Sequence, residues 1–131
     1  MDEILTPINI VADLHTRIKV KRGFFSTDWV DVKTYEFTLQ HCIVKTDEIY
    51  NVGSPIVMSM RFKLDLNEIV VEELTGIVRK KRKDCSCFHY YVELPSTQDM
   101  GTMEANKIKQ IDSIIRKKKA LSTKISNVSR Q

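Results

Sequence analysis

The chain has 131 residues, enough for one domain with a single hydrophobic core and too few for two ordinary domains. Hydrophobic residues make up 42% of it and charged residues 29%, and no apolar run approaches the ~20 residues that a membrane helix needs, so the composition excludes membrane insertion. The formal net charge is +4, and the positive charge is concentrated at 79–83 and 116–119. Such clusters favour a polyanionic partner, such as nucleic acid, a nucleotide or an acidic protein surface.

The chain begins with a predicted flexible leader, residues 1–15, in which a short strand is expected near residues 8–11. The leader starts with the acidic Met1-Asp2-Glu3, unlike the basic start of a secretory signal, and this favours a cytoplasmic location. The first regular strand is predicted over 16–25, because Ile18 and Val20 alternate with cationic residues.

After a turn at 26–28, residues 29–44 predict either one bent strand or two. In the part from 35 to 44, strict alternation would place every odd-numbered residue on one face of the sheet and every even-numbered residue on the other. The first face would carry Tyr35, Phe37, Leu39, His41 and Ile43, and the second Glu36, Thr38, Gln40 and Cys42.

Three further strands are predicted between Gly53 and Leu94, over residues 55–64, 69–79 and 88–94. The first of these alternates most clearly, with Ile56, Met58, Met60, Phe62 and Leu64 on one face. Gly76 lies inside a β-branched run and predicts a bulge or a barrel corner. Residues 83–86 are the expected tip of the last hairpin.

The pattern changes to helical after residue 101. Thr102 is a suitable N-cap, Glu104 complements the helix dipole, and Ile108, Ile111 and Ile115 make an apolar stripe. The helix is predicted to end near residue 120, where the cations of 116–119 suit a C-terminus, and residues 122–131 are predicted to be a disordered tail. The sequence thus predicts an all-β fold, a small six- to seven-stranded antiparallel barrel with a C-terminal helix over one opening.

Aromatic, cysteine and histidine residues give no catalytic or metal constellation. The aromatics predicted to be in the core are Tyr35, Phe37, Phe62, Phe88 and Tyr90, and those predicted to be exposed are Trp29, Tyr50 and Tyr91.

Three cysteines without an export signal predict free thiols. The spacing Cys85-x-Cys87-x-His89 is unlike the usual zinc spacing. His41 cannot serve Cys42 as a base, since neighbours on a strand face opposite ways. We therefore expect no metal, no cofactor and no enzyme.

Several short motifs resemble the PilZ domain, a bacterial six-stranded barrel with a C-terminal helix. They are Val52-Gly53, then Thr75-Gly76-Ile77-Val78-Arg79, and Tyr90-Tyr91-Val92-Glu93-Leu94 before the terminal helix. Tyr91 replaces the family's glycine and Leu94 its phenylalanine. The resemblance covers about residues 16–120, and it predicts one domain of barrel and helix over 16–121.

The resemblance implies a role in cyclic di-GMP signalling. The family binds this ligand through Arg-x-x-x-Arg ahead of the first strand and Asp/Asn-x-Ser-x-x-Gly after the second. Here the nearest match to the first motif is Arg17 with Lys21, and residues 33–40 replace the second without a glycine and with Glu36. The chain is therefore expected to be a degenerate member, an adaptor acting through protein contacts in motility or type IV pilus regulation.

Two basic segments are the candidate sites for an anionic ligand, cyclic di-GMP included. The first comprises Arg17, Lys19, Lys21 and Arg22, and the second Arg79, Lys80, Lys81, Arg82 and Lys83. The alternative function is a small barrel that binds single-stranded nucleic acid through the 79–83 hairpin and Tyr91. In a third interpretation both segments are structural: their charges are simply solvated, or they bind an acidic neighbouring subunit.

Overall fold

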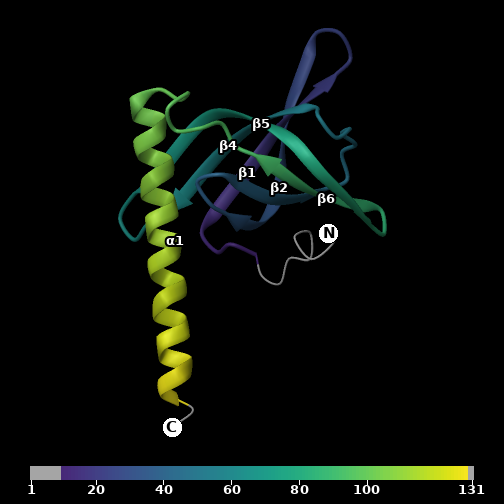
Figure 1. Cartoon of the computed structure of the whole chain (residues 1–131). Helices are drawn as coiled ribbons and strands as arrows, with labels where there is room; N and C mark the ends of the chain where they lie inside the picture. Colours follow the sequence, from purple (N-terminus) through teal and green to yellow (C-terminus); the bar gives the residue numbers. More distant parts are fainter. Residues whose placement is uncertain (1–9, 130–131) are drawn as a thin grey trace.

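Six antiparallel strands close into a barrel in the computed structural model, which describes the backbone of residues 10–129 and the side chains of residues 10–121. The order around the barrel is β1-β2-β3-β6-β5-β4. The strands are β1 (Leu14–Arg22), β2 (Ser26–Phe37), β3 (His41–Thr46), β4 (Pro55–Lys63), β5 (Glu68–Asp84) and β6 (Cys87–Glu93), and one helix follows, α1 (Thr102–Ser129) (Figure 1). The predicted all-β barrel with a C-terminal helix is confirmed.

Strand alternation fills the barrel as predicted in its central part. Ile56, Met58, Met60 and Phe62 of β4 are all buried, while Leu64 packs partly against the core. Gly76 of β5 lies where β6 passes very close: a Cβ on it would meet Val92 Cγ1 at 2.5 Å. The register shifts themselves occur at Met58/Met60 and at Val78/Lys80, so Gly76 marks a close approach rather than a bulge.

The region 29–44 is two strands, and the alternation predicted for 35–44 is wrong. The register shifts between Thr34 and Glu36. As a result Thr34 and Phe37 are both buried, and the two residues between them, Tyr35 and Glu36, are only partly buried. A turn at 38–40 then separates β2 from β3 and shifts the pleat again, so that Cys42 and Val44 face the core. A one-residue shift in register exchanges the faces of every later residue.

The predicted limits of the first strand also need correction. The strand β1 starts at Leu14, inside the predicted leader, and ends at Arg22, so that Phe24 and Phe25 lie in the turn to β2. The short strand expected near residues 8–11 is not seen at Ile10 and Val11, and its first two residues belong to the segment 1–9, which lies outside the described residues.

The helix is longer than predicted. It continues to Ser129, so residues 122–129 are helical and do not form the predicted disordered tail, while 130–131 lie outside the described residues. Ile108, Ile111 and Ile115 pack into the barrel core as expected. The cations of 116–119 therefore lie within the helix, not at its C-terminus. They also lie far from the β5–β6 hairpin, on the opposite side of the barrel (Figure 1), so they do not form one basic patch with the cations of 79–83.

Candidate functional site

In the first basic segment Arg17, Lys19 and Lys21 lie on the exposed face of β1 and Arg22 lies at its end. Most of these cations are paired with carboxylates. Arg17 Nε lies 3.0 Å from Asp31 Oδ1, and Lys19 Nζ lies 3.5 Å from Glu73 Oε1. Within the described residues Lys21 makes no ion pair. Each charge that is already paired is less available to an external phosphate.

Arg22 is the most strongly engaged cation of this segment. Its Nη1 and Nη2 donate to the two carboxylate oxygens of Glu48 at 3.3 and 3.2 Å, and its Nε lies 3.5 Å from Asp28. The hydrogen bonds that Arg22 donates to Glu48, and then the negative charge of that carboxylate, raise the pKa of Arg22. The bidentate fork that would recognise a phosphate is therefore used within the molecule.

The five cations of the second basic segment are distributed over two faces of β5. Arg79 donates to both carboxylate oxygens of Glu93, at 3.3 and 3.2 Å. The Lys80 ammonium lies 5.6 Å from the ring centroid of Tyr91, on the outer face, whereas that of Lys81 lies 4.4 Å from Phe88. Arg82 faces His89 in the strand pairing, and Lys83 faces Phe88. The run of cations in the sequence is therefore not one basic patch.

The two segments are not brought together, because β4 lies between β1 and β5. A groove of about 1230 Å³ follows the outer surface of β2, β1, β4 and β5. It is lined by Arg17 and by Trp29, the neighbour of Lys19, but by no residue of 79–83. Its wall also carries Asp31, Glu68 and Glu73. A groove of mixed charge is a poor site for a ligand with two phosphates.

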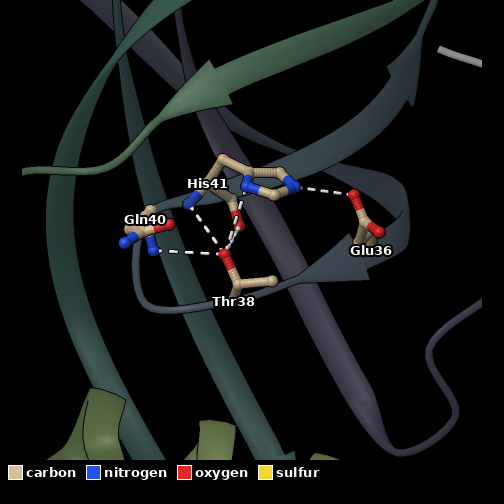
Figure 2. A network of polar contacts seen from close by, with 4 residues as sticks. All are labelled: Glu36, Thr38, Gln40 and His41. Carbon is tan, nitrogen blue, oxygen red and sulfur yellow. Dashed lines mark hydrogen bonds and ion pairs between the residues drawn. The ribbon is translucent and has the colours of Figure 1, made fainter. Parts of the chain in front are cut away.

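The segment that corresponds to the second PilZ motif forms a closed polar network (Figure 2). His41 Nε2 lies 2.6 Å from Glu36 Oε2, and His41 Nδ1 lies 3.1 Å from the Thr38 hydroxyl. The same hydroxyl accepts the backbone N–H groups of Gln40 and His41, which fixes the β2–β3 turn. The His41 ring stacks on Tyr91, with 4.5 Å between the centroids and 15° between the planes.

Tyr90, which was predicted to be in the core, makes a structural contact with Glu48 that the sequence analysis did not predict. Tyr90 is fully buried, donates its hydroxyl proton to the Glu48 carbonyl at 2.7 Å and accepts the Tyr50 N–H at 2.9 Å. Burial raises the pKa of Tyr90. Because Glu48 also binds Arg22, one residue of the β3–β4 loop connects the core to the β1–β2 hairpin. No local pattern predicts a contact between residues so far apart in the sequence.

The cysteines and His89 do not form a reactive site. Burial raises the pKa of the Cys42 thiol to about 12, so the thiol stays protonated, and its sulfur lies 3.9 Å from Met58. Cys85 is exposed at the β5–β6 turn and Cys87 is half-buried. His89 is 7% exposed, and burial, followed by the charge of Lys45, lowers its pKa. Among the described residues, no group of three or more His, Cys, Asp or Glu side chains could hold a metal ion.

Large apolar side chains are exposed at the end of the barrel away from α1. Phe24 and Phe25, at the tip of the β1–β2 hairpin, are 91% and 102% exposed, and Ile49 and Val52 of the β3–β4 loop are also exposed. The sequence analysis missed the two phenylalanines because it extended the first strand through them. Trp29 is exposed as predicted, whereas Tyr50 and Tyr91 are half-buried.

Comparison of the chain with protein-family models, with curated proteins and with solved structures found no match. Within the part of the chain that the structure describes, no helix is long and apolar enough to cross a membrane. The PilZ resemblance thus stays a prediction that rests on the motifs in the sequence.

Proposed function

We propose that this chain is a non-enzymatic bacterial signalling or adaptor module of the PilZ type, which acts in the cytoplasm mainly through protein contacts. The closed six-stranded barrel with its C-terminal helix agrees with the fold that the resemblance implies. The function itself is argued from the side chains at the two places where the family's ligand motifs would lie.

The observation that carries the proposal is the Glu36–His41 pair. It occupies the segment where the family has a glycine and small polar residues, and it closes that segment with a 2.6 Å contact and a stacked Tyr91 ring. A carboxylate at this place opposes a phosphate, and the stacked rings leave less room for the backbone to approach a base. Both effects lower the affinity for cyclic di-GMP.

The arginines support the same conclusion. A dinucleotide would have to displace Asp31 from Arg17 and Glu48 from Arg22 before either guanidinium could bind phosphate. These ion pairs are exposed, and each contributes little to folding, but together they offset the positive charge that would attract the ligand. Meanwhile Phe24, Phe25 and the apolar β3–β4 loop supply exposed apolar surface of the kind found at protein interfaces.

Single-stranded nucleic acid is less well supported as a ligand. Binding of this kind needs aromatic faces that are free to stack on bases, next to cations. Here the Tyr91 ring is stacked on His41 and has Lys80 over it, and Phe88 has Lys81 over it. The aromatic groups beside the basic segment are thus already engaged within the molecule.

Isothermal titration calorimetry at two salt concentrations tests the ligand side of the proposal, with cyclic di-GMP and a single-stranded oligonucleotide as separate titrants. We expect no saturable heat with either. Micromolar binding of cyclic di-GMP would overturn the proposal, and oligonucleotide binding that weakens steeply with salt would favour the rival function. The Glu36→Gln variant serves as a comparison, since it removes the opposing charge and should increase any residual binding of the dinucleotide.

A photo-crosslinking residue tests the protein side in living cells. Placed at Val52, in the apolar β3–β4 loop, it should yield discrete cross-linked species. The same residue at Leu66, which is 99% exposed and lies at the other end of the barrel, should yield few. Equal cross-linking from the two positions would argue against a partner that binds the end of the barrel away from α1.

A further inference from the structure

The β1–β2 hairpin extends beyond both of the strands that flank it. Pairing of β1 with β4 stops at Ile18, and pairing of β2 with β3 starts at Lys33, while β1 and β2 stay paired as far as Arg22 and Ser26. Figure 1 shows this hairpin projecting from the barrel. The segment Ser26–Val32 of β2, which we name the open edge, therefore has a partner strand on one side only.

The open edge retains the capacity to pair with another strand. Seven of its residues pair with β1, and within residues 10–129 none of them makes a further backbone hydrogen bond on its other side. Unpaired backbone N–H and C=O groups of this kind bind an added strand. Proteins usually protect such edges with proline, lysine or a bulge. The open edge contains no proline and no lysine, and its pairing with β1 is regular.

The charges on the open edge are neutralised within the molecule. Asp28 is paired with Arg22 at 3.5 Å, and Asp31 with Arg17 at 3.0 Å. They therefore oppose an incoming strand less than free carboxylates would. Between them lies Trp29, 40% exposed, with the Lys19 ammonium 5.8 Å from its ring.

From these observations we infer that two copies of this chain pair through their open edges to form an antiparallel dimer. The edge is self-complementary about its middle residue: Trp29 faces Trp29 of the second copy, Thr27 faces Asp31, and Asp28 faces Val30. No two like charges lie directly opposite in this register, and an aromatic pair lies at its centre. A two-fold dimer of this type is closed, so it does not extend into a fibre.

Pairing of the open edges also accounts for the exposed tip. In the antiparallel arrangement the hairpin tip of each copy extends past the paired segment toward the second copy's barrel, where β2 starts to pair with the end of β3 at Lys33 and Lys45. The two phenylalanines that are 91% and 102% exposed in one copy would thereby be covered by the other. Burial of such side chains is the main favourable contribution to association.

A membrane surface fits the same hairpin less well. Insertion into lipid would leave the backbone groups of the open edge without hydrogen-bond partners, which is unfavourable in hydrocarbon. Near the tip, Arg22 is already bound to Glu48 and Asp28, so the hairpin has little net positive charge to attract anionic lipid. A second strand satisfies the backbone groups, whereas lipid does not.

Sedimentation velocity from low to high micromolar concentration tests the dimer. Wild-type protein should sediment as a monomer–dimer equilibrium of the 15.2 kDa chain. Trp29→Glu and Trp29→Lys should each weaken the dimer at least ~10-fold, because like charges face each other at the two-fold axis. An equimolar mixture of the two variants should recover it. Leu66→Glu, a substitution at a more exposed apolar residue on the opposite end of the barrel, should leave it unchanged.

Cysteine cross-linking tests the register. In a Cys85→Ser/Cys87→Ser background, Trp29→Cys should form an intermolecular disulfide on mild oxidation, and Thr27→Cys should not, because residue 27 faces residue 31 of the second copy. Circular dichroism checks that each variant is folded. A monomer at all concentrations, a dimer that Trp29→Glu leaves intact, or a monomer that binds anionic vesicles through Phe24 and Phe25 would overturn the inference. The dimer inference does not rest on the adaptor proposal, since sedimentation tests the dimer and calorimetry tests ligand binding, and either result can be negative without the other.

Discussion

The hydroxyl of Tyr90 donates a hydrogen bond to the carbonyl oxygen of Glu48 at 2.7 Å, which fastens the β3–β4 loop to the barrel interior. The Tyr90 hydroxyl oxygen in turn accepts the N–H of Tyr50 at 2.9 Å, and the rings of Tyr50 and Tyr90 meet edge to face. The loop that holds Arg22 through Glu48 is therefore positioned from inside the core.

Removal of this hydroxyl should destabilise the protein. Tyr90→Phe leaves the Glu48 carbonyl and the Tyr50 N–H without their partner in a partly buried loop, and we expect it to lower the free energy of unfolding by about 1–3 kcal/mol. Urea denaturation measures the difference. Tyr91→Phe is the matched control: its hydroxyl makes no hydrogen bond with a described residue, so a change within about 0.5 kcal/mol is expected. Equal losses in both variants would contradict this role of Tyr90.

Substitution of Gly76 should also be costly. A Cβ at this position would meet Val92 Cγ1 at 2.5 Å and the Glu93 carbonyl oxygen at 2.8 Å, and the backbone oxygen cannot move independently of β6. We expect Gly76→Ala to destabilise the protein by about 1–3 kcal/mol, as overpacking does elsewhere. At Gly101 the nearest atom to an added Cβ is the end of the flexible Glu104 side chain, so Gly101→Ala should be mild. Thermal melts of the two variants compare them directly.

His89 should make stability depend on pH. Burial and the Lys45 charge lower its pKa, with a smaller lowering by Arg82 and an opposing effect of Asp84, and its buried Nδ1 has no hydrogen-bond partner in the described structure. Because its folded-state pKa is below the ordinary value of about 6.5, the unfolded state takes up the proton first as pH falls. The contribution of His89 to stability is thus complete above this ordinary value and decreases below it.

Urea denaturation at pH 7.5 and at pH 5 measures how much free energy of unfolding each protein loses between the two pH values, and wild type is compared with histidine variants. His89→Gln should lose less stability than wild type on going to the lower pH, whereas His15→Gln, at an exposed histidine, should follow wild type. Titration of the carboxylates is common to all three proteins and cancels. If His89→Gln and wild type lose the same stability, His89 does not cause the dependence.

The three thiols should react at very different rates. Cys42 is fully buried and its pKa is raised to about 12, so it should not react with Ellman's reagent at pH 8 while the protein is folded. Cys85 is exposed and should react first, followed by the half-buried Cys87. Addition of denaturant should release the third thiol. A Cys42→Ser variant should show only the first two phases, and rapid reaction of all three thiols in native buffer would contradict the burial of Cys42.

The sequence predicted those parts of the fold in which alternation is uninterrupted. In β4, Met58 through Phe62 pair with β1 without a register shift, and the inward face of β4 from Ile56 to Phe62 was predicted correctly. The pattern failed at Thr34/Glu36, where one extra residue reverses the pleat, and the polar composition of 33–40 gives no sign of it. The end of α1 was also missed, because a cluster of cations resembles a C-terminus wherever it lies in a helix.

The candidate site was less predictable because it depends on contacts between distant strands. A row of cations in the sequence indicates positive charge, but the carboxylates that neutralise it come from other strands, as Glu93 does for Arg79 and Glu48 for Arg22. The open edge is a similar case: it exists only because β3 and β4 pair with part of the hairpin and leave the rest. Local patterns contain neither fact.

The burial of Ile108, Ile111 and Ile115 has a practical consequence for dissecting this protein. These side chains belong to the same core as Phe62 and Val71, so α1 is a component of the barrel and not an appendage to it. A fragment cut in the loop before Thr102 would expose that core and aggregate. The shortest segment that retains the full set of core residues runs from Leu14 to Ile115, and a protease should leave it intact while trimming the helix beyond it.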